Sequence, residues 1–332
     1  MSAENSRETF RKRAIHHFRM AALTYRRIMH IYRHYNIKAK NVLYQGDCKK
    51  FFKEIPDNWV DLVITSPPYC MGKTYENPHK DIETFKKDHQ MIFDDLYRVV
   101  KPGGSICWQV GYHISESCVV PLDIIVYDLF TSMSQEKRYP LILRNRIVWT
   151  FGHGLNSKKR FSGRHEMILW FTKGEQKLFN LDDVRVPQKY PGKKSYRGPK
   201  KGELSGNPLG KNPSNVWDIP NVKANHVEKT QHPCQYPIAL PQRLIKALSN
   251  GDDIVLDPFM GVGTTGVAAI IESRRFLGAE IKKDYYDTAV ERMHDAINGI
   301  LKMREDKPSM EPDMQSAVAK LPEEFRIARE GK

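Results

Sequence analysis

The chain has 332 residues, of which 40% are hydrophobic, and carries a formal net charge of +14 at pH 7. This length supports a substantial core, in one large domain or in one domain with an insertion. The sequence contains no apolar run of membrane-spanning length and no apolar segment typical of a signal peptide, so we expect neither a membrane protein nor a secreted one. The five cysteines form no CxxC pair, which favours reduced thiols in a cytoplasm and argues against a metal site.

The basic charge is concentrated in two blocks. Residues 1–40 carry ten Lys and Arg against two acids, and residues 183–230 carry ten against four. A solvated basic surface could by itself explain a positive net charge. Blocks of one sign are more typical of a phosphate-rich partner, because each phosphate contact releases counterions. We therefore favour nucleic acid over a membrane surface, for which the sequence offers no amphipathic anchor.

The predicted elements alternate between strands and helices from residue 42 onward, after a first segment, 1–40, that looks helical. This alternation predicts an α/β fold with a doubly wound, mostly parallel sheet of seven strands. We expect Pro102, Gly103 and Gly104 to separate the second helix from the third strand. The predicted strands are 42–47, 61–65, 105–111, 144–151, 166–173, 253–257 and 275–281, and the predicted helices are 49–60, 82–101, 121–140, 241–249, 264–273 and most of the stretch after 283.

Residues 174–231 interrupt the alternation. Much of this stretch is rich in Gly, Pro, Lys and Asn, a composition typical of a linker or a disordered segment. Tyr190, Tyr196 and Trp217 among the basic residues indicate instead a loop-rich binding insertion, and the sequence leaves these two interpretations level. We divide the chain into a basic helical extension (1–40), two halves of an α/β domain (41–173 and 232–302), the insertion (174–231) and a charged tail (303–332).

A glycine-rich loop, DPFMGVGTT, joins the sixth predicted strand to the next helix. Gly261 and Gly263 let the backbone turn tightly and let a ligand lie against bare main chain. Asp257 ends one strand and Glu280 ends the next, at the edge where ligands gather in open α/β sheets. An acid at the second position typically accepts hydrogen bonds from ribose hydroxyls. With Gly266 the loop also fits GxGxxG, so a nicotinamide dinucleotide stays open here; a P-loop is excluded, because no GK[ST] follows.

A second short segment, Ser66-Pro67-Pro68-Tyr69, follows the strand 61–65. The prolines hold φ at about −65° and remove two N–H groups that would otherwise need partners. Taken alone, this is most simply a stiff turn after a strand. Ser66 Oγ and the Pro67 carbonyl are nevertheless suited to accept hydrogen bonds from an amine, and Tyr69 is suited to stack on a planar ring.

Together these segments resemble a known family. DPFMGVG resembles the cofactor loop of the S-adenosylmethionine-dependent DNA amino-methyltransferases, and TSPPY resembles their catalytic loop. The catalytic loop comes first and the basic insertion lies between the two, an order that resembles the β class. Further matches, over roughly 41–294, are GDC (46–48), KPGG (101–104), RFSGRHEMILWFTK (160–173), NPSNVWDIP (212–220) and HPCQYPIALPQRLI (232–245).

The resemblance implies a circularly permuted, Rossmann-like methyltransferase fold with S-adenosylmethionine as cofactor and double-stranded DNA as substrate. It also implies a functional link to a restriction endonuclease. The target base must leave the duplex to be reached, and methyl transfer then depends mainly on positioning, without a covalent nucleophile or a metal. The implied catalytic residues are Ser66, Pro67, Pro68 and Tyr69. The implied cofactor-binding residues are Asp47 at the adenine, Glu280 at the ribose, and Thr65, His232, Pro233, Asp257, Phe259, Gly261, Gly263 and Thr264.

The target amine is not decided by these residues alone. In this family SPPY favours N4 of cytosine, and N6 of adenine is the alternative, because Ser can accept a hydrogen bond from either amine. We expect the insertion to select the DNA sequence and to grip phosphates. The expected DNA-binding residues are Lys193, Lys194, Arg197, Lys200 and Lys201. Two other classes stay open, a nicotinamide-dependent oxidoreductase and a catalytically inactive DNA-binding module.

One cysteine needs separate treatment. Pro233-Cys234-Gln235 resembles the PCQ motif of cytosine-C5 methyltransferases, in which the cysteine attacks the base. In those enzymes the motif follows the cofactor loop, whereas here it precedes it. We therefore do not expect Cys234 to act as a nucleophile. Tyr236 and Val262 depart from the family's more common Lys and Ser, and neither change removes an obviously needed donor.

Overall fold

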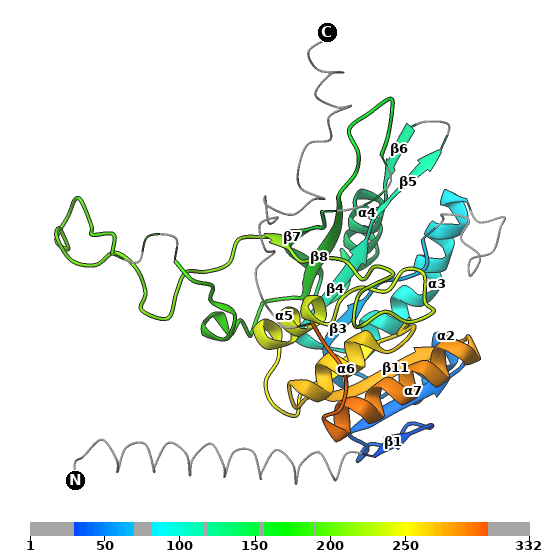
Figure 1. The fold of residues 1–332 in the computed structure, drawn as a ribbon. Coiled ribbons are helices and arrows are strands. Elements are labelled where there is room, and N and C mark those ends of the chain that lie inside the picture. The colour runs from blue at the N-terminus through cyan, green and yellow to red at the C-terminus, as the bar shows by residue number, and fades with distance from the viewer. Residues whose placement is uncertain are drawn as a thin grey trace, which may run out of the picture.

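The structure is a computed structural model. It describes residues 30–69, 81–115, 118–152, 154, 156–188, 190 and 192–304. A large sheet runs through this part of the chain, with helices packed on both of its faces (Figure 1). The predicted α/β class with a mostly parallel sheet is therefore confirmed.

The strands of the main sheet run in the order β1-β2-β11-β10-β3-β4-β8-β7-β9. Neighbouring strands are parallel except around β8, which is antiparallel to both β4 and β7. The bounds are β1 (Ile31–Tyr32), β2 (Asn41–Gln45), β3 (Val60–Thr65), β4 (Val100–Val110), β7 (Leu141–Thr150), β8 (His165–Lys173), β9 (Val216–Asp218), β10 (Ile254–Asp257) and β11 (Arg275–Glu280).

The predicted number of strands is too low. All seven predicted strands occur, but the described part of the sheet contains nine. The additional strands, β1 and β9, are edge strands of two and three residues, too short to show an alternating pattern. β1 lies within the segment that was predicted to be helical, and residues 1–29 of that segment lie outside the described residues. A separate hairpin of β5 (Tyr112–Ser115) and β6 (Cys118–Pro121) was not predicted either.

Each face of the sheet has its own apolar core, because successive side chains of a strand point to opposite faces. In β3, for example, Val63 packs on one side and Leu62 on the other. One face is covered by α2 (Cys48–Glu54), α3 (Ile82–Val99) and α4 (Leu122–Ser134), through Phe51, Phe93 and Phe130. The other face is covered by α5 (Ala239–Leu248), α6 (Thr264–Ile271) and α7 (Lys283–Asn298), through Leu244, Val267 and Met293.

The start of β4 also differs from the prediction. Helix α3 ends at Val99 and the strand begins at Val100, so Pro102, Gly103 and Gly104 lie inside the strand. The register with β3 shifts at this point, as in a β-bulge, and Gly103 has a φ of 83°. A Cβ on Gly104 would lie 2.9 Å from the carbonyl oxygen of Asp61. The glycines therefore allow a close approach of two strands.

The pairing of β3 with β10 brings distant segments together. These strands are parallel neighbours, and Thr65 and Asp257 at their ends are 192 residues apart in the chain. Because β2 and β11 run in the same direction beside them, the loops after all four strands emerge at one edge of the sheet. This carboxyl edge is where open α/β sheets bind ligands.

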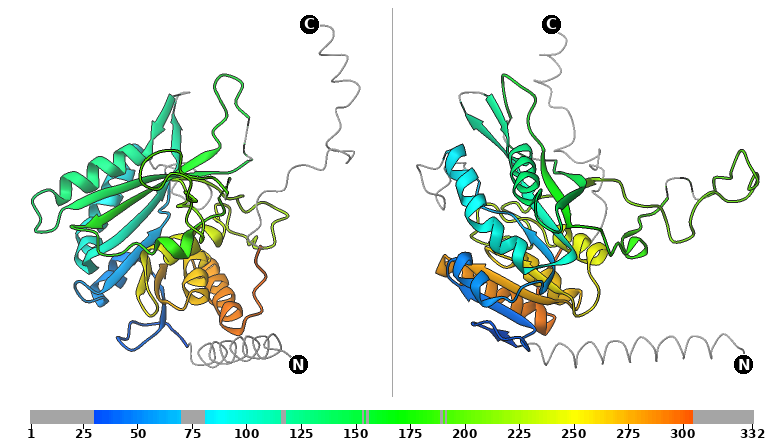
Figure 2. Two further views of the ribbon diagram at one scale, coloured as in Figure 1. Left: turned by 90° about the vertical axis from the view of Figure 1, so that its left-hand side faces the viewer. Right: turned by 180° about the vertical axis from the view of Figure 1, so that it is seen from behind.

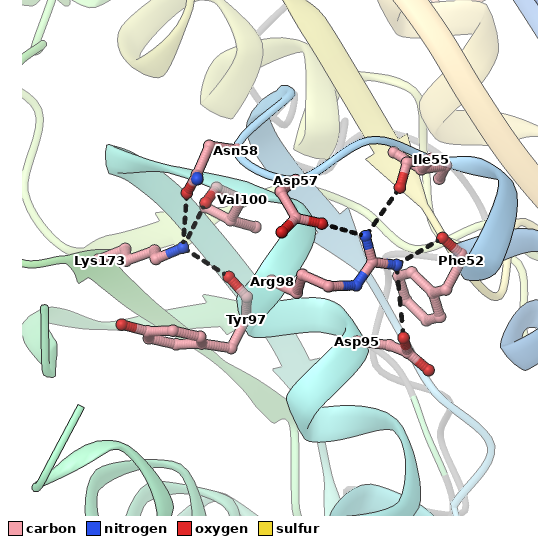
Figure 3. A network of polar contacts seen from close by, with 9 residues as sticks. All are labelled: Phe52, Ile55, Asp57, Asn58, Asp95, Tyr97, Arg98, Val100 and Lys173. Carbon is pink, nitrogen blue, oxygen red and sulfur yellow. Dashed lines mark hydrogen bonds and ion pairs between the residues drawn. The ribbon is translucent and has the colours of Figure 1, made fainter. Parts of the chain in front are cut away.

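The opposite, amino edge holds a network of hydrogen bonds and ion pairs around one buried and one partly buried cation (Figure 3). Lys173, which is 3% exposed, donates hydrogen bonds to the side chain of Asn58 and to the carbonyl groups of Tyr97 and Val100. Arg98 donates to the carbonyl groups of Phe52 and Ile55 and to the carboxylates of Asp57 and Asp95. The network ties the end of α3 to α2, β4 and β8.

The segment 174–231 combines buried ends with an exposed middle. A 3₁₀ turn at Leu181–Val184 packs near α5, and β9 pairs with β7. Trp217 of β9 is 8% exposed, so it belongs to the core and not to a binding surface as predicted. The described residues of the middle, 188, 190 and 192–210, form an arm that projects from the body (Figures 1 and 2). Two isolated bridges, Val186 with Lys211 and Lys194 with Leu204, hold its two sides together.

Candidate active site

A cavity of about 520 Å³ opens at the carboxyl edge of the sheet. Its lining comes from the loops that follow β2, β3, β10 and β11, and from the segment 232–236 that precedes α5. Residues of β4, β7, β8, α3 and α7, together with residues 221–222, also contribute to it. The predicted site residues in the lining are Asp47, Ser66, Pro67, Pro68, Tyr69, His232, Pro233, Phe259, Gly261, Thr264 and Glu280. Both predicted loops therefore border one cavity.

The remaining predicted site residues do not line this cavity. Thr65, Asp257 and Gly263 lie directly behind its lining, as the contacts below show. The five basic residues predicted to bind DNA lie on the exposed arm. The arm and the cavity are therefore two separate surfaces of the described chain.

Asp257 is a fully buried carboxylate that joins the two loops from behind. It accepts hydrogen bonds from the hydroxyl of Thr65 at 2.6 Å, the hydroxyl of Thr265 at 2.7 Å and the amide of Phe259 at 3.1 Å. Burial raises the pKa of Asp257, and these donors counter part of that shift because they favour the ionised form. The bond to Thr65 fixes the end of β3 against the end of β10, and thereby sets the spacing of the loops.

Glu280 borders the cavity at the end of β11. Its carboxylate accepts hydrogen bonds from the backbone N–H of Gly261, at 3.0 Å, and of Lys282, at 2.8 Å. Its carbonyl group accepts from the N–H of Gly46 at 2.9 Å. Burial raises the pKa of Glu280, against these backbone donors, which lower it. A carboxylate fixed by main-chain donors at the cavity wall is suited to accept hydrogen bonds from ligand hydroxyls.

The glycine loop uses its two glycines for different purposes. Gly261 has a φ of 51° and faces the cavity, where a Cβ would lie 3.5 Å from the ring of His232. Gly263 has a φ of 75° and begins α6, and a Cβ there would lie 2.9 Å from that of Ala289 on α7. Gly263 therefore serves the packing of α6 on α7. Thr264 lines the cavity and its hydroxyl accepts a hydrogen bond from Arg292 at 3.0 Å.

Asp47 occupies the corresponding position after β2. Its carboxylate accepts a hydrogen bond from the N–H of Lys49 at 2.8 Å and so caps α2. Gly46 before it, and Cys48 and Lys49 after it, also line the cavity. The capping bond explains why a short acidic residue stands at this position. Because Asp47 also lines the cavity, it lies next to the space that a ligand would occupy.

The loop predicted to be catalytic, Ser66–Tyr69, carries a connected set of polar groups. The hydroxyl of Tyr69 lies 3.0 Å from Ser66 Oγ, 3.3 Å from Glu166 Oε2 and 3.4 Å from the carbonyl oxygen of Gln109. The amide of Gln109 donates to the same Glu166 oxygen at 2.7 Å. Tyr69 is 6% exposed, and its ring belongs to the cavity wall. The sequence interpretation missed Gln109 and Glu166; the only signal was the match over 160–173, which includes Glu166.

The segment 232–236 covers the glycine loop. The ring of His232 packs edge-on against Tyr285 of α7, with 4.6 Å between centroids. Tyr236 donates a hydrogen bond to Asp257 at 3.2 Å and is also bonded to the hydroxyl of Thr265. Burial raises the pKa of Tyr236 well above its usual value, so this phenol stays neutral. Tyr236 and Tyr285 both line the cavity and were not predicted to be site residues.

Two features are absent from the residues that the structure describes. No group of three or more His, Cys, Asp or Glu side chains in them is arranged to hold a metal ion. No helix in the same residues has the length and apolar character needed to cross a membrane.

Comparison with known proteins identifies the family. The family model described as DNA methylase, of the N6 and N4 methyltransferases, matches residues 60–291. The chain belongs to this family. The Type II methyltransferase M.BglII of Bacillus subtilis is 50% identical over 250 residues, which cover 75% of this chain and 68% of that protein. The predicted resemblance to the DNA amino-methyltransferases is thereby confirmed, and with it the restriction–modification context of the family.

Relatives with different target bases are found. The DNA adenine methyltransferase YhdJ of Escherichia coli is 33% identical over 264 residues, covering 77% of this chain and 83% of that protein. The structure of the PvuII DNA methyltransferase, described as cytosine-N4-specific, shares the fold with a TM-score of 0.58 at 22% identity, over 78% of this chain and 92% of that one. A DNA modification methylase of Thermus thermophilus, solved with S-adenosylmethionine, gives a TM-score of 0.55 at 25% identity, over 77% and 94%.

Proposed function

We propose that the chain transfers a methyl group from S-adenosylmethionine to the N4 amine of a flipped-out cytosine in double-stranded DNA. The observation that carries this proposal is the convergence of the Ser66–Tyr69 loop and the glycine loop on one cavity of about 520 Å³. Such a cavity can hold a cofactor and one base side by side, because ligand pockets of about 300–1,000 Å³ enclose most of a ligand's surface.

The residues present fit the proposed cofactor. Glu280 offers a carboxylate that can accept hydrogen bonds from ribose hydroxyls. Asp47 lines the same cavity, and the residue before it, Gly46, donates a backbone hydrogen bond to the carbonyl group of Glu280. At Gly261 the backbone itself borders the cavity, because no side chain lies between it and the ring of His232. The related Thermus thermophilus protein, solved with S-adenosylmethionine, supports the same cofactor here. When bound, it would supply a methyl group on a positively charged sulfur.

The catalytic loop would activate the target amine. The lone pair of an exocyclic amine is delocalised into the ring, so the nitrogen is a poor nucleophile. Acceptors that hold both amine hydrogens draw the nitrogen toward tetrahedral geometry and release the lone pair. Ser66 Oγ and the Pro67 carbonyl are the acceptors at the cavity wall, and the ring of Tyr69 would support the base. Holding amine and methyl donor in line accounts for most of the acceleration we expect.

Cytosine is proposed because the loop reads Ser-Pro-Pro-Tyr and because the fold is shared with a cytosine-N4 enzyme. Adenine N6 is the second candidate, since a relative at 33% identity is named as an adenine methyltransferase. Mass spectrometry of nucleosides from DNA of a host that expresses the chain tests this choice. We expect N4-methylcytosine in the wild type and a much smaller amount with Ser66→Ala. N6-methyladenine alone would reject cytosine and keep the family reaction, and neither product would reject the reaction.

The same proposal assigns DNA recognition to residues 174–231. Its arm exposes five cations, and Tyr190 and Tyr196 are 65% and 83% exposed. Exposed aromatics among cations suit contacts with phosphates and base edges. The order of the loops in the chain supports the circularly permuted arrangement of the fold. A partner endonuclease is part of the proposal because relatives such as M.BglII are named Type II methyltransferases.

A further inference from the structure

A chain of polar groups leads from the catalytic loop to β8. It starts at Ser66 Oγ, passes the hydroxyl of Tyr69 at 3.0 Å and reaches Glu166 Oε2 after a further 3.3 Å. Gln109 closes the far end, with its carbonyl oxygen 3.4 Å from the tyrosine hydroxyl and its amide 2.7 Å from the same glutamate oxygen. Ser66, Tyr69, Gln109 and Glu166 all border the cavity.

The far end of this chain determines the direction of its hydrogen bonds. An ionised carboxylate and a backbone carbonyl can only accept hydrogen bonds, and a hydroxyl has a single proton to donate. Glu166 and the Gln109 carbonyl therefore take the proton of Tyr69. The tyrosine oxygen must then accept in its contact with Ser66, so the proton of Ser66 points to Tyr69. Ser66 is left with lone pairs only toward its other neighbours.

This direction is the one that the proposed reaction requires. An acceptor at Ser66 can hold a hydrogen of the target amine. A serine that turned its proton to the amine nitrogen would instead occupy the lone pair that must attack the methyl group. We infer that Glu166 is a positioning residue, which acts through Tyr69 to hold Ser66 as a hydrogen-bond acceptor for the target amine. The inference rests on the proposed function.

Two substitutions interrupt the chain at different points. Glu166→Gln replaces an acceptor-only group by one that can also donate, and Tyr69→Phe removes the central hydroxyl while keeping the buried ring. We expect each variant to lower the single-turnover rate of methyl transfer about 10- to 100-fold, the range for a lost hydrogen bond to a charged group. The KM for S-adenosylmethionine should stay unchanged, because neither group belongs to the cofactor loop.

The double variant gives the sharpest readout. Because both changes break the same chain, the double variant should be hardly slower than the slower single variant. Glu291→Gln, the same change on the exposed face of α7, serves as the matched control and should keep the wild-type rate. Thermal unfolding of each variant identifies a folding defect, and Tyr69→Phe then carries the test if Glu166→Gln fails to fold.

Several outcomes would overturn the inference. A wild-type rate in Glu166→Gln would show that the carboxylate does not orient the chain. Losses that multiply in the double variant would show two independent roles, and a loss confined to the KM would show a role in cofactor binding. Failure of the proposed function is a different result, since the wild-type protein itself would then transfer no methyl group to DNA.

Discussion

The two edges of the sheet both hold charged groups that are buried or partly buried, but they use them differently. At the amino edge, Lys173 and Arg98 direct their N–H groups to oxygen atoms of α2, α3, β4 and the turn between α2 and β3 (Figure 3). At the carboxyl edge, Glu280 and Glu166 also have fixed partners, yet both border the cavity. Burial raises the pKa of Glu280, so the fold keeps its charge at some cost in stability.

This difference separates charges that hold the fold from charges that serve a ligand. A network that is closed on the protein should cost stability when one member is lost, because its partners stay buried without a bond. A group at the cavity wall whose pKa is raised by burial should cost function when it is lost, and little or no stability. Substitutions at the amino edge should therefore lower stability and leave methyl transfer unchanged. Substitutions at the carboxyl edge should lower methyl transfer and leave stability nearly unchanged.

The largest effect is expected at the catalytic loop. Under the proposed mechanism, Ser66→Ala removes one of the two acceptors for the target amine, and it should lower the rate of methyl transfer about 10²- to 10³-fold, as for other groups that stabilise a transition state. The unfolding temperature should change little, because Ser66 is only partly buried and the hydroxyl of Tyr69 keeps its contacts with Glu166 and Gln109. Radioactive methyl transfer and thermal unfolding measure the two effects. Ser132→Ala, at an exposed position of α4, is the control. A drop in stability of Ser66→Ala without a drop in rate would show that this residue of the carboxyl edge supports the fold and not the reaction.

The arm should behave unlike either edge, because its cations neither close a network nor face the cavity. If Lys193, Lys194, Arg197, Lys200 and Lys201 all contact phosphates, replacing them with Ala should make the salt slope of DNA binding shallower by about 4 to 5 units. Neither unfolding nor cofactor binding should change. Fluorescence anisotropy on duplex DNA over a range of salt concentrations gives the slope. The double variant Lys50→Ala, Lys53→Ala on α2 is the control. If the arm variant had the same slope as the wild type, the cations of the arm would be solvated and would not contact phosphates.

At the amino edge, Lys173→Met should lower stability without affecting chemistry. Three acceptors lose their donor, and we expect the free energy of unfolding to fall by about 2–4 kcal/mol. Chemical denaturation measures this, and the rate per folded molecule should equal that of the wild type. Lys86→Met, which breaks only a surface pair with Glu83 on α3, should cost less than about 0.5 kcal/mol. A strong loss of rate in stable Lys173→Met would connect this edge to the active site.

A smaller effect, with a specific dependence on pH, is expected at Glu280. Its pKa in the folded protein is raised by burial, so the stability associated with this group is highest at low pH and is lost as pH rises through that pKa. In the proposed function, the ionised form of Glu280 is the one that would accept hydrogen bonds from the ribose hydroxyls. Affinity for S-adenosylmethionine should therefore fall about tenfold per unit as pH drops below the raised pKa. Titration calorimetry measures this, and Glu280→Gln should bind weakly with no such slope; a slope that persists in the variant would assign it to another group.

The sequence predicted the carboxyl edge better than the amino edge, for a physical reason. Strand ends and glycines leave local signals, so Asp257 and Gly261 stand out by position, whereas Ser66 stands out only through the family resemblance of its Ser-Pro-Pro-Tyr motif. The alternating α/β pattern predicts that β3 and β10 run parallel, but it does not predict that they are neighbours. Lys173 and Arg98 give no local signal, because their partners are mostly backbone carbonyls brought together by the fold. Glu166 was missed for the same reason, since antiparallel β8 delivers it to the cavity from about a hundred residues away.

The insertion shows a second limit of the sequence. Gly, Pro and Lys in 190–220 suggested a loop, and the arm is one. The same composition hid β9 and the burial of Trp217, because a strand of three residues has no period to detect. Likewise, Pro102 and Gly103 indicated a break after α3, whereas the strand continues through them as a bulge. In each case tertiary pairing overrode a local preference.

The smallest effect is expected from Cys234, which borders the cavity and could appear to be a nucleophile. Its neighbours hold this segment beside the glycine loop. His232 packs on Tyr285 and accepts a hydrogen bond from the N–H of Cys234. Tyr236 donates a hydrogen bond to Asp257. The amine chemistry at Ser66 requires no covalent step. Cys234→Ala should therefore keep the wild-type rate of methyl transfer, with Cys118→Ala on the exposed hairpin as control. Loss of activity in a folded Cys234→Ala, with a protein–DNA adduct in the wild type, would replace direct amine transfer with attack of the Cys234 sulfur on the base.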